Sequence, residues 1–356
     1  MCVELGLYPL VKLVTGKRKV LLNYGVAIEN RDFEKLNQLE LEWRLACHGK
    51  GIRENFNFAV KRYGIIEFEK FVNVPCGKCE QCLKSRARGW AYRILKEAEQ
   101  YDNNYFITFT YDDVHLPVKY INGYCVSTLI KSEISDFNKK LKTYLKRKGL
   151  KSDFRFYGVG EYGSNTYRSH YHVIYFNLDL PNDLEFYKYE KGNIYFKSDF
   201  LNSVWSKGFV VVGALDIGSA CYVARYCDKK LDRTDSEKTV FTDFDVLPEF
   251  SVMSRRPGIG SFMIDKIIHN IKNKVYSLSV RGNDFSIPIY YSKKIKELLP
   301  DDVLKEYEAH SEMLIKNKIN KDLLLSDILG TDRSLQSYYI EEDNFKKSCK
   351  RQRDNL

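Results

Sequence analysis

The sequence lacks a long apolar run. No stretch of about 18 apolar residues occurs in its 356 residues, which excludes a membrane-spanning helix. The chain begins MCVEL, without a basic segment followed by an apolar one, so we expect no secretory signal and a cytoplasmic location. It also has no internal repeat, no low-complexity tract and no Gly-x4-Gly-Lys-Ser/Thr phosphate loop. We therefore expect no nucleotide cofactor and no ATP-driven motor.

Core-forming side chains and positive charge are both plentiful. Hydrophobic residues make up 44% of the chain and aromatic residues 14%, which excludes intrinsic disorder as the global state. At about 150 residues per domain, the length predicts two domains or one domain with large additions. Lysine and arginine number 57 against 47 acidic residues, and the net charge of +10 favours a polyanionic partner.

Helical periodicity predicts a long basic helix over residues 82–100, whose apolar side chains recur at steps of three and four. The basic residues of this segment are expected over much of its remaining surface: Lys84, Arg86, Arg88 and Arg93. Further helices are expected at about 134–145, 219–230 and 262–274, and from about 293 onward. Ser132 or Ser135 can cap the first of these.

Other segments are rich in β-branched and aromatic residues, which predicts strands. These segments are residues 105–111, 154–159, 170–176 and 208–212. Two short apolar runs near the N-terminus flank the basic residues 15–19, and this pattern predicts a hairpin.

The most informative segment contains two histidines two positions apart. In a strand, His170 and His172 point to the same face because side chains alternate, whereas Tyr171 points to the opposite face. Two neighbouring imidazoles form half of a divalent-metal site, and Glu161, at the end of the preceding predicted strand, is well placed to supply a third ligand. The alternative is that the histidines pack or form hydrogen bonds in a half-buried strand.

A second motif combines two tyrosines and two lysines in a predicted helix. Tyr222 and Tyr226 are four residues apart and so share a helix face, with Lys229 and Lys230 near the same stripe. A phenol must be activated to act as a nucleophile, and a lysine can stabilise developing negative charge. A metal-binding histidine pair followed by paired tyrosines suits phosphodiester cleavage through a phosphotyrosine. The alternative is an amphipathic helix that buries two tyrosine rings.

In order, these segments resemble the HUH superfamily of single-strand endonucleases, and within it the replication initiation proteins of microviruses of the gokushovirus type. The resemblance covers about residues 75–260 and includes Ser169 where the family commonly has a proline. The segments that carry it are residues 75–82 with Arg86, Ala87 and Trp90, residues 106–111, 160–163 and 168–176, Trp205 with Gly208, and residues 222–230 and 254–260.

The resemblance implies an enzyme that nicks and rejoins single-stranded DNA at a phage origin, which starts and ends rolling-circle replication in the infected bacterial cell. It implies Mg²⁺ or Mn²⁺ at His170 and His172, with Glu161 added by position. Tyr222 or Tyr226 would form a 5′-phosphotyrosine, with either Lys229 or Lys230 as the catalytic lysine. The free 3′-OH would be used by a host DNA polymerase, and unwinding would require a host helicase.

The resemblance also implies the fold class, an α+β protein with a central antiparallel sheet flanked by helices. We expect a zinc-knuckle-like N-terminal region and a helical C-terminal extension around this endonuclease core. The expected divisions are residues 1–100, 101–235, 236–292 and 293–356.

Nine cysteines in a chain without an export signal predict reduced thiols or metal ligands rather than disulfides. Cys76, Cys79 and Cys82 offer three thiolates at knuckle-like spacing, whereas a structural zinc site needs four ligands. Because related sequences often begin with an early cysteine, Cys2 is the first choice for the fourth ligand and Cys47 the second. The alternative is three unligated thiols at the start of a helix.

Several basic residues are candidates for contacts with DNA phosphates, and such contacts make binding salt-dependent. These candidates are Arg86, Arg88, Lys146, Arg147, Lys148, Arg168, Arg255 and Arg256. The alternative for each helical group is a solvated face. The rival function is a non-catalytic zinc-knuckle protein that binds single-stranded nucleic acid. A two-histidine phosphoesterase is disfavoured, because His-x-Thr/Ser does not occur twice.

Overall fold

The computed structural model divides into two compact units, residues 1–84 and residues 85–356. It describes residues 6–25, 33–74, 80–121, 123–163, 166–190, 192–226, 245–280, 283–285 and 287–329. Helix α3 (Glu80–Ala98) crosses the division between the units. Among these described residues, no helix combines the length and the apolar character needed to cross a membrane.

The first unit is a small α/β unit that the sequence patterns indicated only in part. Its antiparallel sheet has the order β2-β1-β3, and the hairpin predicted around residues 15–19 is the β1–β2 connection. Trp43 is fully buried and stacks on Phe56 with 4.2 Å between ring centroids. The elements of this unit are β1 (Gly6–Leu13), β2 (Arg18–Val20), η1 (Leu22–Tyr24), α1 (Phe33–Cys47), α2 (Glu54–Tyr63) and β3 (Ile65–Val74).

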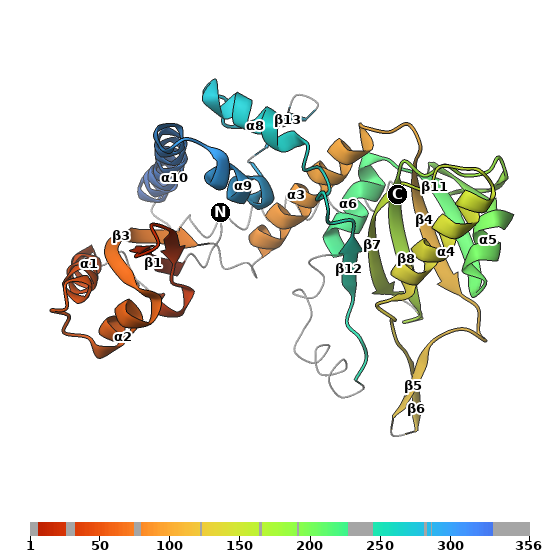
Figure 1. The fold of residues 1–356 in the computed structure, drawn as a ribbon, viewed down its shortest axis with the longest axis horizontal. Coiled ribbons are helices and arrows are strands. Elements are labelled where there is room, and N and C mark those ends of the chain that lie inside the picture. The colour runs from red at the N-terminus through yellow and green to blue at the C-terminus, as the bar shows by residue number, and fades with distance from the viewer. Residues whose placement is uncertain are drawn as a thin grey trace. The chain divides into compact units, whose positions relative to one another are not determined.

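The second unit is built on a seven-stranded sheet in the order β12-β7-β8-β4-β11-β10-β9, in which every neighbouring pair is antiparallel (Figure 1). The four strands predicted from the sequence are its central members. The β9–β10 hairpin and the β12 strand were not predicted. The strands are β4 (Asn104–Tyr111), β7 (Arg155–Tyr162), β8 (Ser169–Phe176), β9 (Leu184–Glu190), β10 (Asn193–Ser198), β11 (Gly208–Ala214) and β12 (Phe250–Met253).

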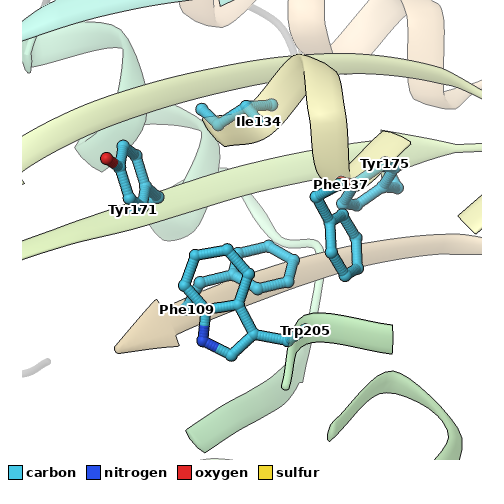
Figure 2. Close-up of a pocket in the computed structure, with 6 residues that line it drawn as sticks. All are labelled: Phe109, Ile134, Phe137, Tyr171, Tyr175 and Trp205. Atoms are coloured by element: carbon cyan, nitrogen blue, oxygen red, sulfur yellow. The ribbon is translucent and has the colours of Figure 1, made fainter. Parts of the chain in front are cut away.

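Alternating side chains divide this sheet into two faces, each with its own apolar core. On one face, α4 (Glu133–Arg147) and α5 (Asp199–Trp205) cover an aromatic cluster. Figure 2 shows six members of this cluster, in which Phe109 lies 4.6 Å from Phe137 and 5.3 Å from Trp205. Rings fill this side, so the histidines of β8 lie on the other face.

On that other face, α6 (Ile217–Tyr226) packs on β7 and β8. Its Ala220 and Val223 share a core with Ile94 of α3. The two fully buried β8 residues Ile174 and Phe176 belong to the same core, as their even numbering with the histidines requires.

Further elements surround the sheet. Helices α8, α9 and α10 share a third apolar cluster with Tyr92 of α3. These additional elements are β5 (Val118–Ile121), β6 (Tyr124–Ser127), α8 (Met263–Lys272), β13 (Leu278–Val280), β14 (Asn283–Phe285), α9 (Ile289–Leu298) and α10 (Asp301–Leu329). Ser132 precedes α4, yet its side chain makes no capping hydrogen bond and contacts Asp136 instead.

The prediction of an α+β fold with an antiparallel sheet flanked by helices is confirmed. The zinc-knuckle region stays a prediction, because residues 75–79 lie outside the described residues.

Candidate metal centre

The two histidines of β8 and the glutamate of β7 are brought together by strand register. Glu161 is directly opposite His170, and Val159 is opposite His172. Directly opposed residues share a face with their Cβ atoms about 4.5–5.5 Å apart. The pairing of β7 with β8 therefore sets the carboxylate beside both imidazoles.

The ligand atoms of this cluster lie close together. Glu161 Oε1 is 2.7 Å from His170 Nε2 and 3.1 Å from His172 Nε2. One donor atom from each of the three residues falls within 4.8 Å of the others. Glu161 is only 3% exposed and His172 8%, so the cluster is largely removed from bulk water.

Both imidazoles are oriented through their other ring nitrogen. His170 Nδ1 lies 3.1 Å from the Arg168 carbonyl oxygen, which can only accept, so this nitrogen carries the proton. His172 Nδ1 lies 2.8 Å from the Thr108 hydroxyl, on the neighbouring strand β4. Such contacts direct the Nε2 lone pairs toward a metal and fix the ring planes.

Thr108 was missed by sequence reasoning. It lies in the predicted strand 105–111, where Thr108 and Thr110 are the polar members of an otherwise apolar and aromatic pattern. That alternation indicated a polar face. It did not indicate that β4 is the neighbour of β8.

Charge at the centre is set by a competition between burial and hydrogen bonding. Burial alone raises the pKa of the Glu161 carboxyl, but hydrogen bonds with His170 and His172 hold that pKa well below its usual range. The carboxylate is therefore ionised at neutral pH. An ionised oxygen and two imidazole nitrogens form a donor set that fits a divalent cation and leaves positions for substrate oxygens.

Helix α6 carries Tyr222 to the same place. The Tyr222 hydroxyl donates to Glu161 Oε1 at 3.0 Å and lies 3.5 Å from His172 Nε2. Its ring packs edge-on against His172 with 5.2 Å between centroids. Tyr226 is one turn further along α6, with its side chain outside the described residues, and Lys229 and Lys230 also lie outside them.

Comparison with known proteins identifies the family. The family model of the phage replication-associated protein ORF2 matches residues 104–231, the segment that contains β4, β7, β8 and α6. Replication-associated protein VP4 of Bdellovibrio phage phiMH2K is 31% identical over 242 residues, which cover 68% of this chain and 73% of the relative. The chain belongs to the phage replication-associated protein family.

Two further members of the family are also similar. Replication-associated protein ORF2 of Spiroplasma virus 4 is 29% identical over 301 residues, covering 82% of this chain and 90% of the relative. Replication-associated protein ORF4 of Chlamydia phage 1 is 26% identical over 235 residues, covering 64% and 55%. No solved structure gives a significant match. The resemblance to microvirus-type replication initiators is confirmed by these members.

A buried ion pair fixes the loop that contains Arg255 and Arg256. Glu97 of α3 pairs with Arg155 of β7, and Glu97 Oε2 accepts from the Gly260 backbone N–H at 2.6 Å. Arg155 Nη2 donates to the Pro257 carbonyl at 2.8 Å. The ends of the loop are thus held, while Arg255 and Arg256 are exposed.

The same region corrects one expectation from the family's basic helix. Arg93 is not on a solvated surface. It is 6% exposed, donates from Nε to the Ile259 carbonyl at 2.9 Å, and its guanidinium lies 3.6 Å from the centroid of Tyr290. Its stripe on α3 faces α9 and the loop, so it supports structure. Arg86 and Arg88, by contrast, are exposed.

The other predicted DNA contacts are not gathered at the centre. Lys146, Arg147 and Lys148 are exposed at the end of α4, which covers the opposite face of the sheet. Arg168 is at the edge of the centre, where it pairs with Asp113 at 2.7 Å. Their contacts with DNA stay predictions.

The predicted zinc ligands are only partly described. Cys82 is half-buried in the first turn of α3, while Cys2, Cys76 and Cys79 lie outside the described residues. Cys47, the second choice for the fourth ligand, is half-buried at the end of α1 and packs against the core of the first unit. The zinc site therefore stays a prediction.

Proposed function

We propose that this protein initiates phage DNA replication by nicking and rejoining single-stranded DNA at the origin. One observation carries the proposal: the Tyr222 hydroxyl lies within 3.5 Å of both His172 Nε2 and Glu161 Oε1, inside a His-His-Glu cluster. A phenol beside a metal-binding donor set is positioned to attack a phosphorus atom whose oxygen is held there. The names of the related phage proteins, all replication-associated, support a role in replication.

In the proposed nicking step, Tyr222 Oη forms a bond to phosphorus while the bond from phosphorus to the 3′-oxygen breaks. The phenolic proton is balanced by the proton that the departing 3′-oxygen takes up. The products are a 5′-phosphotyrosine and a free 3′-OH. A host DNA polymerase would extend that 3′-OH, and a host helicase would unwind the duplex.

Rejoining is the reverse reaction. Because the phosphotyrosine is a phosphodiester like the bond it replaces, attack by a 3′-OH restores the DNA strand without ATP. Tyr226 lies one helical turn after Tyr222, and residues four apart share a helix face. In this scheme one tyrosine holds a DNA end while the other attacks the next junction, which allows one protein to start and end a round.

The remaining residues of the centre bind and orient. Glu161 and the Nε2 atoms of His170 and His172 would hold Mg²⁺ or Mn²⁺, which when bound supplies Lewis-acid polarisation of the scissile phosphate. Arg168 and Thr108 hold the imidazole rings in place through Nδ1. One of the two lysines that follow α6 in sequence would stabilise the charge on the departing oxygen.

The test is incubation with single-stranded oligonucleotides that tile the replicon, in Mn²⁺, followed by mass spectrometry of the protein. We expect a DNA adduct on Tyr222 or Tyr226, and its loss in the double variant Tyr222→Phe, Tyr226→Phe. Tyr144→Phe is the matched control, because Tyr144 lies on α4 at the opposite face and is 40% exposed.

The rival function gives a different result. A non-catalytic binding protein retains oligonucleotides in a salt-dependent manner, yet forms no adduct with or without Mn²⁺. If no oligonucleotide becomes joined to the wild-type protein, or the double variant forms the same adduct, the proposed nicking function is wrong.

A further inference from the structure

A narrow hairpin projects from the second unit, formed by β5 and β6 (Figure 1). It forms a two-stranded sheet of its own and is not a member of the seven-stranded sheet. Two aromatic side chains are strongly exposed on it, Tyr120 at 77% and Tyr124 at 67%. An isolated two-stranded hairpin is only marginally stable, so large exposed rings on it indicate a contact surface.

The base of this hairpin is joined to the strands that carry the metal ligands. Ser127 Oγ donates to Ser169 Oγ at 2.9 Å and accepts from the Ser169 backbone N–H at 3.0 Å. Ser169 immediately precedes His170. Two residues after β6, the Leu129 backbone N–H donates to Tyr162 Oη at 3.0 Å, and Tyr162 immediately follows Glu161.

A second contact holds the hairpin itself. Lys119 of β5 forms an ion pair with Asp245 at 2.5 Å, at the start of the segment that leads to β12. The Leu247 backbone N–H donates to Thr128 Oγ1 at 3.3 Å, while Tyr162 Oη donates to the Leu247 carbonyl at 2.6 Å. The hairpin is therefore fixed to the same edge of the sheet as the candidate centre.

The two tyrosines face opposite sides of the hairpin. Tyr120 is paired in register with Cys125, so these two residues share a face. Tyr124 is adjacent to Cys125 in the strand and therefore points the other way. A ribbon with an aromatic ring on each side can enter between two unstacked bases, with one base against each ring.

The charge of the hairpin suits an anionic strand. Residues 118–127 contain one lysine and no carboxylate. Aromatic side chains bind single-stranded nucleic acid by stacking with little sequence preference, because every base has a π-face.

We propose that the β5–β6 hairpin is a base-stacking wedge for single-stranded DNA, in which Tyr120 and Tyr124 each bind one base next to the scissile phosphate. The inference rests on the proposed nicking function for the word scissile, but the binding surface is tested separately. Its role is to hold the strand that enters the metal centre, by separating two bases that otherwise stack on each other.

The experiment measures binding of fluorescent oligothymidylate by anisotropy in the full-length protein, with EDTA present so that no metal-dependent cleavage occurs. We expect Tyr120→Ala and Tyr124→Ala each to weaken binding about tenfold, as loss of one stacked base does. Tyr120→Trp and Tyr124→Phe are expected to bind as the wild type does, because stacking needs the ring and not the hydroxyl. Tyr189→Ala is the matched control, since Tyr189 has the same 67% exposure as Tyr124 but lies on the edge strand β9.

Position is tested with the oligonucleotide that the wild-type protein cleaves, carrying an abasic site next to the nick. If a tyrosine stacks on the missing base, its alanine variant and the abasic site weaken binding no more together than either does alone. The wedge is refuted if both alanine variants bind oligothymidylate as tightly as the wild type, or if Tyr189→Ala weakens binding equally. Failure of the nicking function shows itself separately, as intact DNA with the wild-type protein.

Discussion

Replacing Thr108 by valine should weaken metal binding without unfolding the protein. Valine keeps the branched shape and the strand preference of threonine, and it removes the hydroxyl that lies 2.8 Å from His172 Nδ1. The imidazole is 8% exposed, so water has little access to replace the lost partner. Metal binding at Nε2 requires the proton on Nδ1, which the variant leaves without an acceptor.

The size of the effect follows from this burial. Leaving a buried polar group unsatisfied costs about 1–3 kcal/mol. At about 1.4 kcal/mol per factor of ten, the affinity for Mn²⁺ should fall about 10-fold to 100-fold, the range found when outer-shell partners of metal ligands are removed.

The assay counts free Mn²⁺ by electron paramagnetic resonance while protein is titrated in, which needs no DNA and no catalysis. Thr110→Val is the matched control, because Thr110 is on the same strand face and its hydroxyl donates to the Phe209 carbonyl at 3.0 Å instead of to a histidine. Equal thermal unfolding of both variants shows that the fold is kept. The reasoning is refuted if Thr108→Val binds Mn²⁺ as tightly as the wild type, or if Thr110→Val loses the same affinity.

Three further predictions concern structure outside the centre. Gly208→Ala should lower the free energy of unfolding by about 3 kcal/mol in urea titrations, because Gly208 has φ of 151° and an added Cβ would meet the Thr110 carbonyl oxygen at 2.3 Å; wild-type stability in the variant would contradict this. Glu97→Gln should cost about 3–5 kcal/mol in the same measurement, since it leaves Arg155 as a largely buried charge without its partner; a change below about 1 kcal/mol, typical of an exposed pair, would count against it. Purified protein should contain stoichiometric zinc by atomic emission, and Cys79→Ala should lose both the metal and stability; zinc-free wild-type protein would end this idea.

The pattern of single strands was predictable, because it depends on local chemistry. Alternation along residues 170–176 placed His170 and His172 on one face, and the β-branched and aromatic runs marked the four central strands of the sheet. The spacing of Tyr222 and Tyr226 likewise fixed their shared helix face before any packing was known.

The pattern predicted less where exposure was averaged over a helix. Arg93 read as part of a solvated basic helix, yet α9 and the loop at residues 257–260 cover it. Lys146 to Lys148 read as candidate DNA contacts, yet their helix covers the face opposite the histidines. Periodicity shows which side chains share a face, and it does not show what that face packs against.

The sequence alone therefore determined the ingredients of the centre: the histidine pair, a nearby glutamate and a tyrosine helix. Only the tertiary structure decided that β7 and β4 flank β8, which puts Glu161 opposite His170 and Thr108 against His172. Only packing of α6 on β7 and β8 carried Tyr222 to the carboxylate, and only the serine contact at the base of β6 tied the exposed hairpin to the same edge. The physical reason is that side-chain direction is a local property of the backbone, whereas strand neighbours and helix docking depend on contacts between residues far apart in the chain.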